Sequence, residues 1–135
     1  MVRKGFTMIE MLIVLAVIAA LMSVITPTAI NAIKSAKGTQ IALNMRTALI
    51  VAQEYLMTEQ KSEVPATFLE NTRFFSSKMD MAKYHLSSTD SSGKITVTVT
   101  ADAQGVSNYV IKAWSQATGD NTAGVSAQTM IQRFW

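Results

Sequence analysis

The feature that most constrains this chain is an uncharged apolar run near its N-terminus. No charged residue occurs from Met11 to Ile33, which gives 23 consecutive positions. A helix of that length can span the hydrocarbon core of a bilayer, which is about 30 Å thick. The chain has 135 residues, enough for one small domain, whose core is too small to hide a helix that is apolar on every side. The sequence therefore predicts a membrane-inserting N-terminus and a small polar head.

Composition excludes several functional classes. There is no cysteine, which rules out a disulfide scaffold, an iron–sulfur site, thiolate-bound zinc and a cysteine nucleophile. A catalytic triad or a histidine-rich metal site would rest on His85, the single histidine, and the many serines and threonines have no paired base. The net charge is +3, but Arg3 and Lys4 supply two of the positive charges, and +1 remains if a leader carrying them is removed. We expect no enzyme activity, no cofactor and no metal.

Glu10 separates this N-terminus from ordinary targeting segments. One ordinary interpretation is a secretory signal peptide cleaved near residues 17–19. Another is a signal anchor that Arg3 and Lys4 hold on the cytoplasmic side. Neither interpretation has a use for a carboxylate within the membrane segment, where a charge is costly and normally marks a functional pairing.

A partner for Glu10 would arise if a peptidase cut the chain between Gly5 and Phe6. Phe6 would then carry a free, positively charged amine four residues before Glu10, at helical spacing. In an assembly, the amine of one subunit could meet Glu10 of the next. In a medium of low dielectric constant, such an ion pair compensates a charge that would otherwise be stranded.

These residues resemble a known signal. A short basic leader, the run from Gly5 to Glu10 and the apolar residues 11–18 resemble the class III signal of type IV pilins and type II secretion pseudopilins. The resemblance is close to about residue 30 and looser to about residue 60. It implies that a prepilin peptidase cuts after Gly5 and N-methylates Phe6, that Glu10 forms an assembly salt bridge, and that Pro27 is the family's helix-breaking proline.

Pro27 has two interpretations that the sequence leaves open. Proline is tolerated in membrane helices, and it then only kinks the helix. Pro27 and Gly38 are also both weak points in a helix, and the resemblance implies that the helix loosens near such points during assembly.

One long helix is predicted from Phe6 to Glu59, about 80 Å long and kinked at Pro27. Its second half is amphipathic, and Pro65 lies beyond its end. The apolar stripe consists of Ile30, Ile33, Ile41, Met45, Leu49, Ala52 and Leu56. We expect four parts: a leader (1–5), a membrane and assembly helix (6–30), an amphipathic continuation (31–60) and a globular head (61–135).

The head is predicted to hold a small antiparallel sheet. Residues 94–101 alternate strictly, with Ile95, Val97, Val99 and Ala101 on one face. We expect this strand to pair with a strand at 82–87 through a turn at 89–93, and with another at 108–115 through a turn at 102–107. Residues 66–80 are read as a connector with a short helix, 119–124 as an exposed loop and 125–135 as a last strand. The expected fold class is α+β and pilin-like, with the sheet packed on the second half of the helix.

Isolated carboxylates of the head are assigned to turns and connectors. They are Asp80, Asp90, Asp102 and Asp120. Some pseudopilins bind calcium in a C-terminal loop, but Asp120 is the only carboxylate in the loop at 119–124, and Ca²⁺ takes about six to eight oxygen ligands. Trp114 and Trp135 are read as packing residues. The absence of cysteine also departs from the adhesive pilins, which usually carry a C-terminal disulfide.

The resulting hypothesis is a structural subunit of a type IV pilus-like filament. Its partners would be further copies of the chain in a helical filament, the prepilin peptidase, an inner-membrane assembly platform and, before assembly, the lipid bilayer. The precursor would cross the bacterial inner membrane once, and the product would be an extracellular pilus or a periplasmic pseudopilus. The alternatives are a type II secretion pseudopilin, and a minor pilin or binding module that presents its head to DNA or to surfaces.

Overall fold

The computed structural model describes residues 6–70, 75, 79, 82–120 and 124–134. The chain divides into two compact units, residues 1–33 and 34–135. One helix, α1 (Met8–Glu59), belongs to both units, because the division falls within it.

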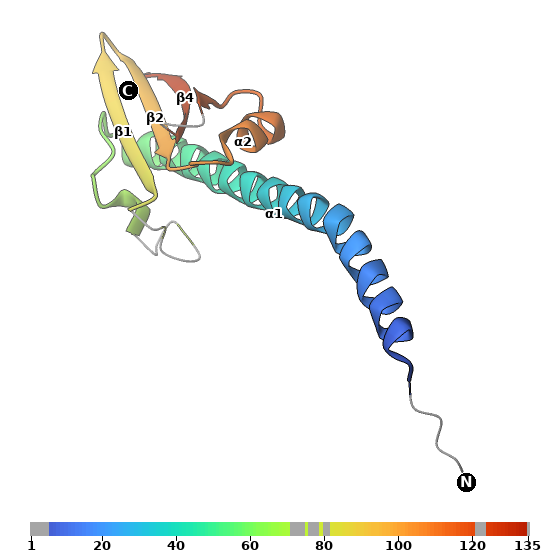
Figure 1. The fold of residues 1–135 in the computed structure, drawn as a ribbon. Helices are drawn as coiled ribbons and strands as arrows, with labels where there is room; N and C mark the ends of the chain where they lie inside the picture. The colour runs from blue at the N-terminus through green and yellow to red at the C-terminus, as the bar shows by residue number, and fades with distance from the viewer. Residues whose placement is uncertain (1–5, 71–74, 76–78, 80–81, 121–123, 135) are drawn as a thin grey trace. The chain divides into compact units, whose positions relative to one another are not determined.

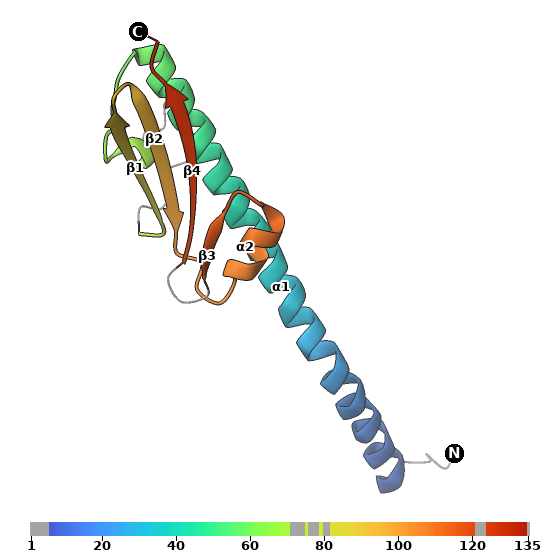
Figure 2. The ribbon, with the colours of Figure 1, turned by 90° about the horizontal axis from the view of Figure 1, so that it is seen from above.

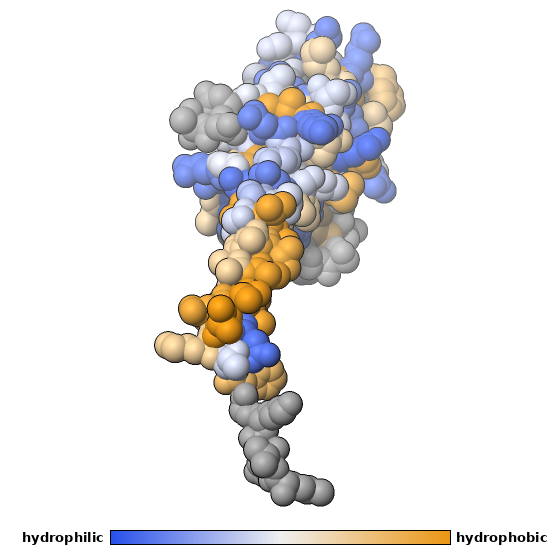
Figure 3. Space-filling view, turned by 45° about the vertical axis from the view of Figure 1, so that its right-hand side comes forward, coloured by the Kyte–Doolittle hydropathy of each residue, from blue (hydrophilic) through white to orange (hydrophobic). Residues whose placement is uncertain are grey.

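In the first unit, every described residue from Phe6 to Ile33 is exposed, although most of them are large and apolar. Figure 3 shows this half of α1 as a nearly continuous hydrophobic surface. By length and composition, α1 contains a segment able to cross a membrane. The helix continues through Pro27, and the kink expected there stays a prediction.

The second unit packs the rest of α1 against a sheet of four antiparallel strands, as Figures 1 and 2 show. In the order of the sheet, these are β1 (Tyr84–Ser91), β2 (Lys94–Ala101), β4 (Gly124–Gln132) and β3 (Thr118–Asp120). A short 3₁₀ helix, η1 (Phe68–Glu70), and a second helix, α2 (Ser107–Ala113), complete the unit. The predicted α+β class, with a sheet on the second half of the long helix, is confirmed.

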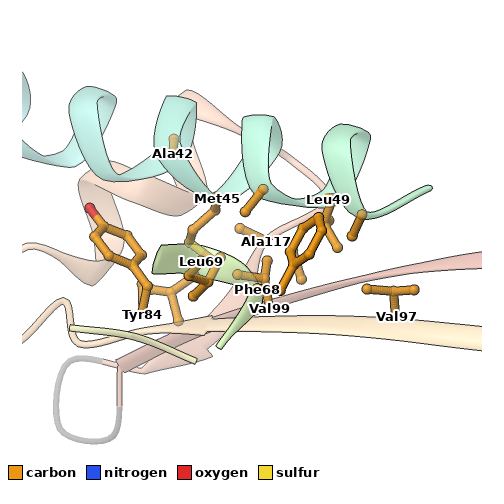
Figure 4. Close-up of a cluster of buried hydrophobic side chains, with 14 of the residues drawn as sticks. Ala42, Met45, Leu49, Phe68, Leu69, Tyr84, Val97, Val99 and Ala117 are labelled. Atoms are coloured by element: carbon orange, nitrogen blue, oxygen red, sulfur yellow. The ribbon is translucent and has the colours of Figure 1, made fainter. Parts of the chain in front are cut away.

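The core lies between α1 and the sheet. Met45, Leu49 and their neighbours on α1 face Val97 and Val99 of β2 in Figure 4. The predicted alternation of β2 is confirmed, since Ile95, Val97, Val99 and Ala101 are all buried. Of the predicted stripe, Met45, Leu49, Ala52 and Leu56 are buried and Ile41 is half-buried. Ile30 and Ile33 were wrongly included, because they are exposed and precede Gly38, the first buried residue of α1.

The strand predicted at 108–115 is wrong, because α2 occupies most of that range. Tyr109, Ile111 and Ala113 alternate as a strand would, but the buried positions of α2 are Ser107 and Val110, three residues apart. Gly38 explains the packing: a Cβ at this position would lie 2.5 Å from Tyr109 Cβ and 3.0 Å from Val110 N. The backbone of α2 therefore approaches α1 at the one residue that has no side chain.

Other element boundaries differ from the predicted ones. β1 begins two residues later than predicted and continues to Ser91. The turn after it therefore consists of Ser92 and Gly93 alone, whose φ angles are 55° and 82°. Two central residues with positive φ are what a two-residue hairpin requires. β3 begins one residue before the predicted loop at 119–124 and overlaps its first two residues, and residues 121–123 of that loop are outside the described residues. In place of a strand at 108–115, β2 pairs with β4, which ends at Gln132 rather than at residue 135.

Candidate processing and assembly site

The predicted site residues lie on both sides of the start of α1. Gly5 is outside the described residues. Phe6 and Thr7 precede the helix, and the Phe6 side chain is 81% exposed. The helix was predicted to begin at Phe6 and begins two residues later, at Met8.

Thr7 and Glu10 form a reciprocal cap that explains where α1 begins. The backbone N–H of Thr7 donates to Glu10 Oε2 at 2.7 Å, and the Thr7 hydroxyl donates to the same oxygen at 2.8 Å. In return, the Glu10 backbone N–H donates to Thr7 Oγ1 at 3.4 Å, and the Thr7 carbonyl accepts from Met11 N. This is a capping box, in which the residue before the helix and the third helical residue satisfy each other's backbone groups.

The capping box is a role for Glu10 that the sequence interpretation missed. Its signal was present, since Thr followed three residues later by Glu, just before an apolar run, is the pattern of a capping box. In a single chain, Glu10 therefore has donors of its own. A carboxylate at this position can serve a plain membrane anchor as well as a filament, so Glu10 by itself does not separate the two.

A groove runs beside Glu10 on the first turns of α1. It is lined by Phe6, Met11, Ile13 and Val14 together with Glu10, so a single carboxylate stands among apolar side chains. Such surroundings suit a group that combines an apolar body with one positive charge.

Pro27 lies among hydroxyl groups that offer hydrogen bonds to the helix backbone. Proline has no N–H, so the carbonyl four residues earlier, that of Ser23, loses its usual donor. Three neighbouring hydroxyls donate to carbonyls three or four residues earlier: Ser23 to Ala20 at 2.8 Å, Thr26 to Met22 at 2.8 Å, and Thr28 to Ile25 at 2.7 Å. None of these three hydroxyls reaches the Ser23 carbonyl, so they do not replace the donor that Pro27 lacks.

The head residues considered for chemistry have structural surroundings. His85 is exposed on β1. Asp90 accepts from Gly93 N in the hairpin turn and pairs with Arg133 at 2.8 Å, and Asp102 accepts from Gln104 N at 3.3 Å. Trp114 packs half-buried against the core, as expected of a packing residue. Asp80, the side chain of Asp120 and Trp135 are outside the described residues.

Across the described parts of the chain, no group of three or more histidine, cysteine or acidic side chains could hold a metal ion.

The comparisons with known proteins bear on the N-terminus. Residues 1–26 match the family model described as the prokaryotic N-terminal methylation motif. The matched range includes Gly5, Phe6 and Glu10 and ends just before Pro27. Comparison with curated proteins and with solved structures gave no match.

Proposed function

We propose that this chain is the structural subunit of a type IV pilus-like filament, because it is a member of the type IV pilin and pseudopilin family. A prepilin peptidase would cut it after Gly5 and N-methylate Phe6, and the cut chain would polymerise through residues 6–30. The observation that carries the proposal is the methylation motif joined to a helix whose described first half is apolar and exposed on every side.

The chemistry begins with hydrolysis of the peptide bond between Gly5 and Phe6. Water adds across the bond, Gly5 leaves as the carboxylate end of the leader, and Phe6 becomes an amine that is protonated at neutral pH. That ammonium group is the proposed partner of Glu10 on the neighbouring subunit. In surroundings from which water is excluded, the attraction offsets the cost of desolvating both charges only when the two groups meet closely.

The ion pair would also fix the register between subunits. Apolar helices can slide along one another with little change in contact, because their surfaces are nearly uniform. Each processed helix carries one ammonium group, at Phe6, and one carboxylate, at Glu10, and a single offset brings the ammonium of one helix beside the carboxylate of the next. We propose that Glu10 sets the axial position of each new subunit in this way.

Before assembly, the precursor would sit in the inner membrane. Arg3 and Lys4 favour a cytoplasmic N-terminus, and residues 6–30 would cross the bilayer. The head, residues 61–135, would then lie on the periplasmic side, carried by residues 31–60. Entry into the filament would require an inner-membrane assembly platform, and helices of other subunits would replace lipid around α1.

We prefer a pilus to a secretion pseudopilus because the loop at 119–124 has few groups that could bind calcium. Asp120 is the only carboxylate at 119–124, where a calcium-binding pseudopilin needs several oxygen ligands. Both assignments share the same processing and assembly chemistry.

Two measurements on cells that overproduce the protein test the proposal. Electron microscopy should show long extracellular filaments that contain this chain. Intact-mass spectrometry should give a chain that begins at Phe6 and carries one added methyl group. Processed protein that stays in the membrane and forms no filaments would instead favour a minor pilin or a membrane-anchored binding module. A chain that begins at Met1 or near Ala20 would refute prepilin processing.

A further inference from the structure

The two oxygens of the Glu10 carboxylate have different surroundings. Both donors of Thr7 reach Oε2, at 2.7 and 2.8 Å. Oε1 accepts no hydrogen bond from any other residue that the structure describes. Residues 1–5 depart with the leader, so they cannot occupy Oε1 in the cut chain. After processing, one oxygen is therefore held and the other is open to a donor from outside.

The donors to Oε2 fix the direction of the carboxylate. A free glutamate side chain has several rotamers, and ordering it on binding lowers affinity. The backbone N–H and the hydroxyl of Thr7 come from one residue and meet at one oxygen, so they select a single arrangement before any partner arrives. In that arrangement Glu10 lines the apolar groove with Phe6, Met11 and Val14, and in the single chain it is exposed, so a partner can reach it.

We infer that Thr7 is a positioning residue for assembly, which holds Glu10 through Oε2 so that Oε1 can accept the Phe6 ammonium group of a second copy of this chain. The inference rests on the proposed function, and it adds a residue that the assembly mechanism would need. Thr7 touches neither the incoming subunit nor the cut bond in this account. It acts through Glu10.

Three substitutions of Thr7 in the full chain separate positioning from simple helix capping. Thr7→Val keeps the size and shape of the side chain but removes the hydroxyl. Thr7→Ser keeps the hydroxyl and should behave as the wild type. Thr7→Gly removes the hydroxyl, yet glycine stabilises a helix start nearly as well as threonine does. Glu10→Val serves as the reference for complete loss of the carboxylate.

The readouts are the yield of filaments sheared from cells and the intact mass of the membrane-extracted protein. Positioning predicts normal processing in all three Thr7 variants. It predicts a filament yield about three- to tenfold lower in Thr7→Val and Thr7→Gly, because the loss of one hydrogen bond of ordinary net strength changes an equilibrium constant by about that factor. The filament yield of Thr7→Ser should be normal.

Other outcomes overturn the inference in distinguishable ways. A normal yield from Thr7→Gly with a reduced yield from Thr7→Val would make Thr7 a helix cap only. Normal yields from both, or a reduced yield from Thr7→Ser, would remove the hydroxyl from the mechanism while the proposed function stands. A wild-type chain without filaments, or normal filaments from Glu10→Val, would refute the proposed pairing, and the role of Thr7 would fall with it.

Discussion

At the scale of single residues, the proposed processing depends on the small size of Gly5. A peptidase that works at the membrane surface must approach the backbone of the cut bond closely, and a glycine permits this because it has no side chain. We expect Gly5→Val to leave uncut precursor in the inner membrane, detected by immunoblot as a chain of the full precursor size. Val2→Gly, a change elsewhere in the leader, should be processed normally. Normal processing of Gly5→Val would remove Gly5 from the site.

Gly38 is a second residue whose missing side chain matters, here for packing. Alanine normally stabilises a helix relative to glycine by about 1 kcal/mol. At Gly38, however, the added Cβ would lie 2.5 Å from Tyr109 Cβ and 2.9 Å from the Tyr109 carbonyl carbon, and backbone atoms cannot swing aside. We expect Gly38→Ala to lower the free energy of unfolding by about 1–3 kcal/mol, as overpacking does.

Urea unfolding of the detergent-solubilised chain measures this change. Thr39→Ala, at the exposed neighbouring position, is the matched control and should be neutral or slightly stabilising. If Gly38→Ala were as stable as that control, the close contact between α1 and α2 would be wrong.

At the scale of secondary-structure elements, β2 tests which face of the sheet meets α1. Val97 is fully buried, whereas the neighbouring Thr98 is half-buried on the opposite face. We expect Val97→Asp to lower the free energy of unfolding by at least about 3 kcal/mol, because it buries a charge without a partner. Thr98→Asp should have a much smaller effect. A larger loss of stability from Thr98→Asp than from Val97→Asp in thermal unfolding would mean that the faces are assigned the wrong way round.

β2 and α2 also show what the sequence of the head can and cannot predict. Residues 94–101 alternate over their whole length, so the pattern alone identifies a strand with a buried face. Residues 107–113 are too short for periodicity to separate strand from helix. Their backbone lies close to Gly38, which is distant in the sequence, so no local pattern reveals this packing.

The candidate site, like the head, could be predicted from the sequence only in part. Its residue types at Gly5, Phe6 and Glu10 could be read from the sequence, and so could the capping pattern of Thr7. The sequence could not predict that both Thr7 donors meet at one carboxylate oxygen, because this contact depends on side-chain rotamers.

At the scale of the whole molecule, the apolar half of α1 requires a partner. From Phe6 to Ile33 the described chain is exposed, and contact of so much apolar surface with water is strongly unfavourable. Lipid can cover this surface in the precursor, and helices of other subunits can cover it in a filament. Apolar burial accounts for both states but does not select one register between subunits. The proposed ion pair of Glu10 with the Phe6 ammonium group would select that register.

Glu10→Gln isolates the role of the Glu10 charge in assembly, because it separates charge from helix capping. Glutamine at the third helical position can complete a capping box as glutamate does, but it cannot form an ion pair. We expect the variant to insert, to be cut after Gly5 and to begin at Phe6 by intact mass, yet to give sharply fewer sheared filaments than the wild type. Filaments at the wild-type yield from Glu10→Gln would refute the ion pair, and would leave Glu10 as part of a helix cap.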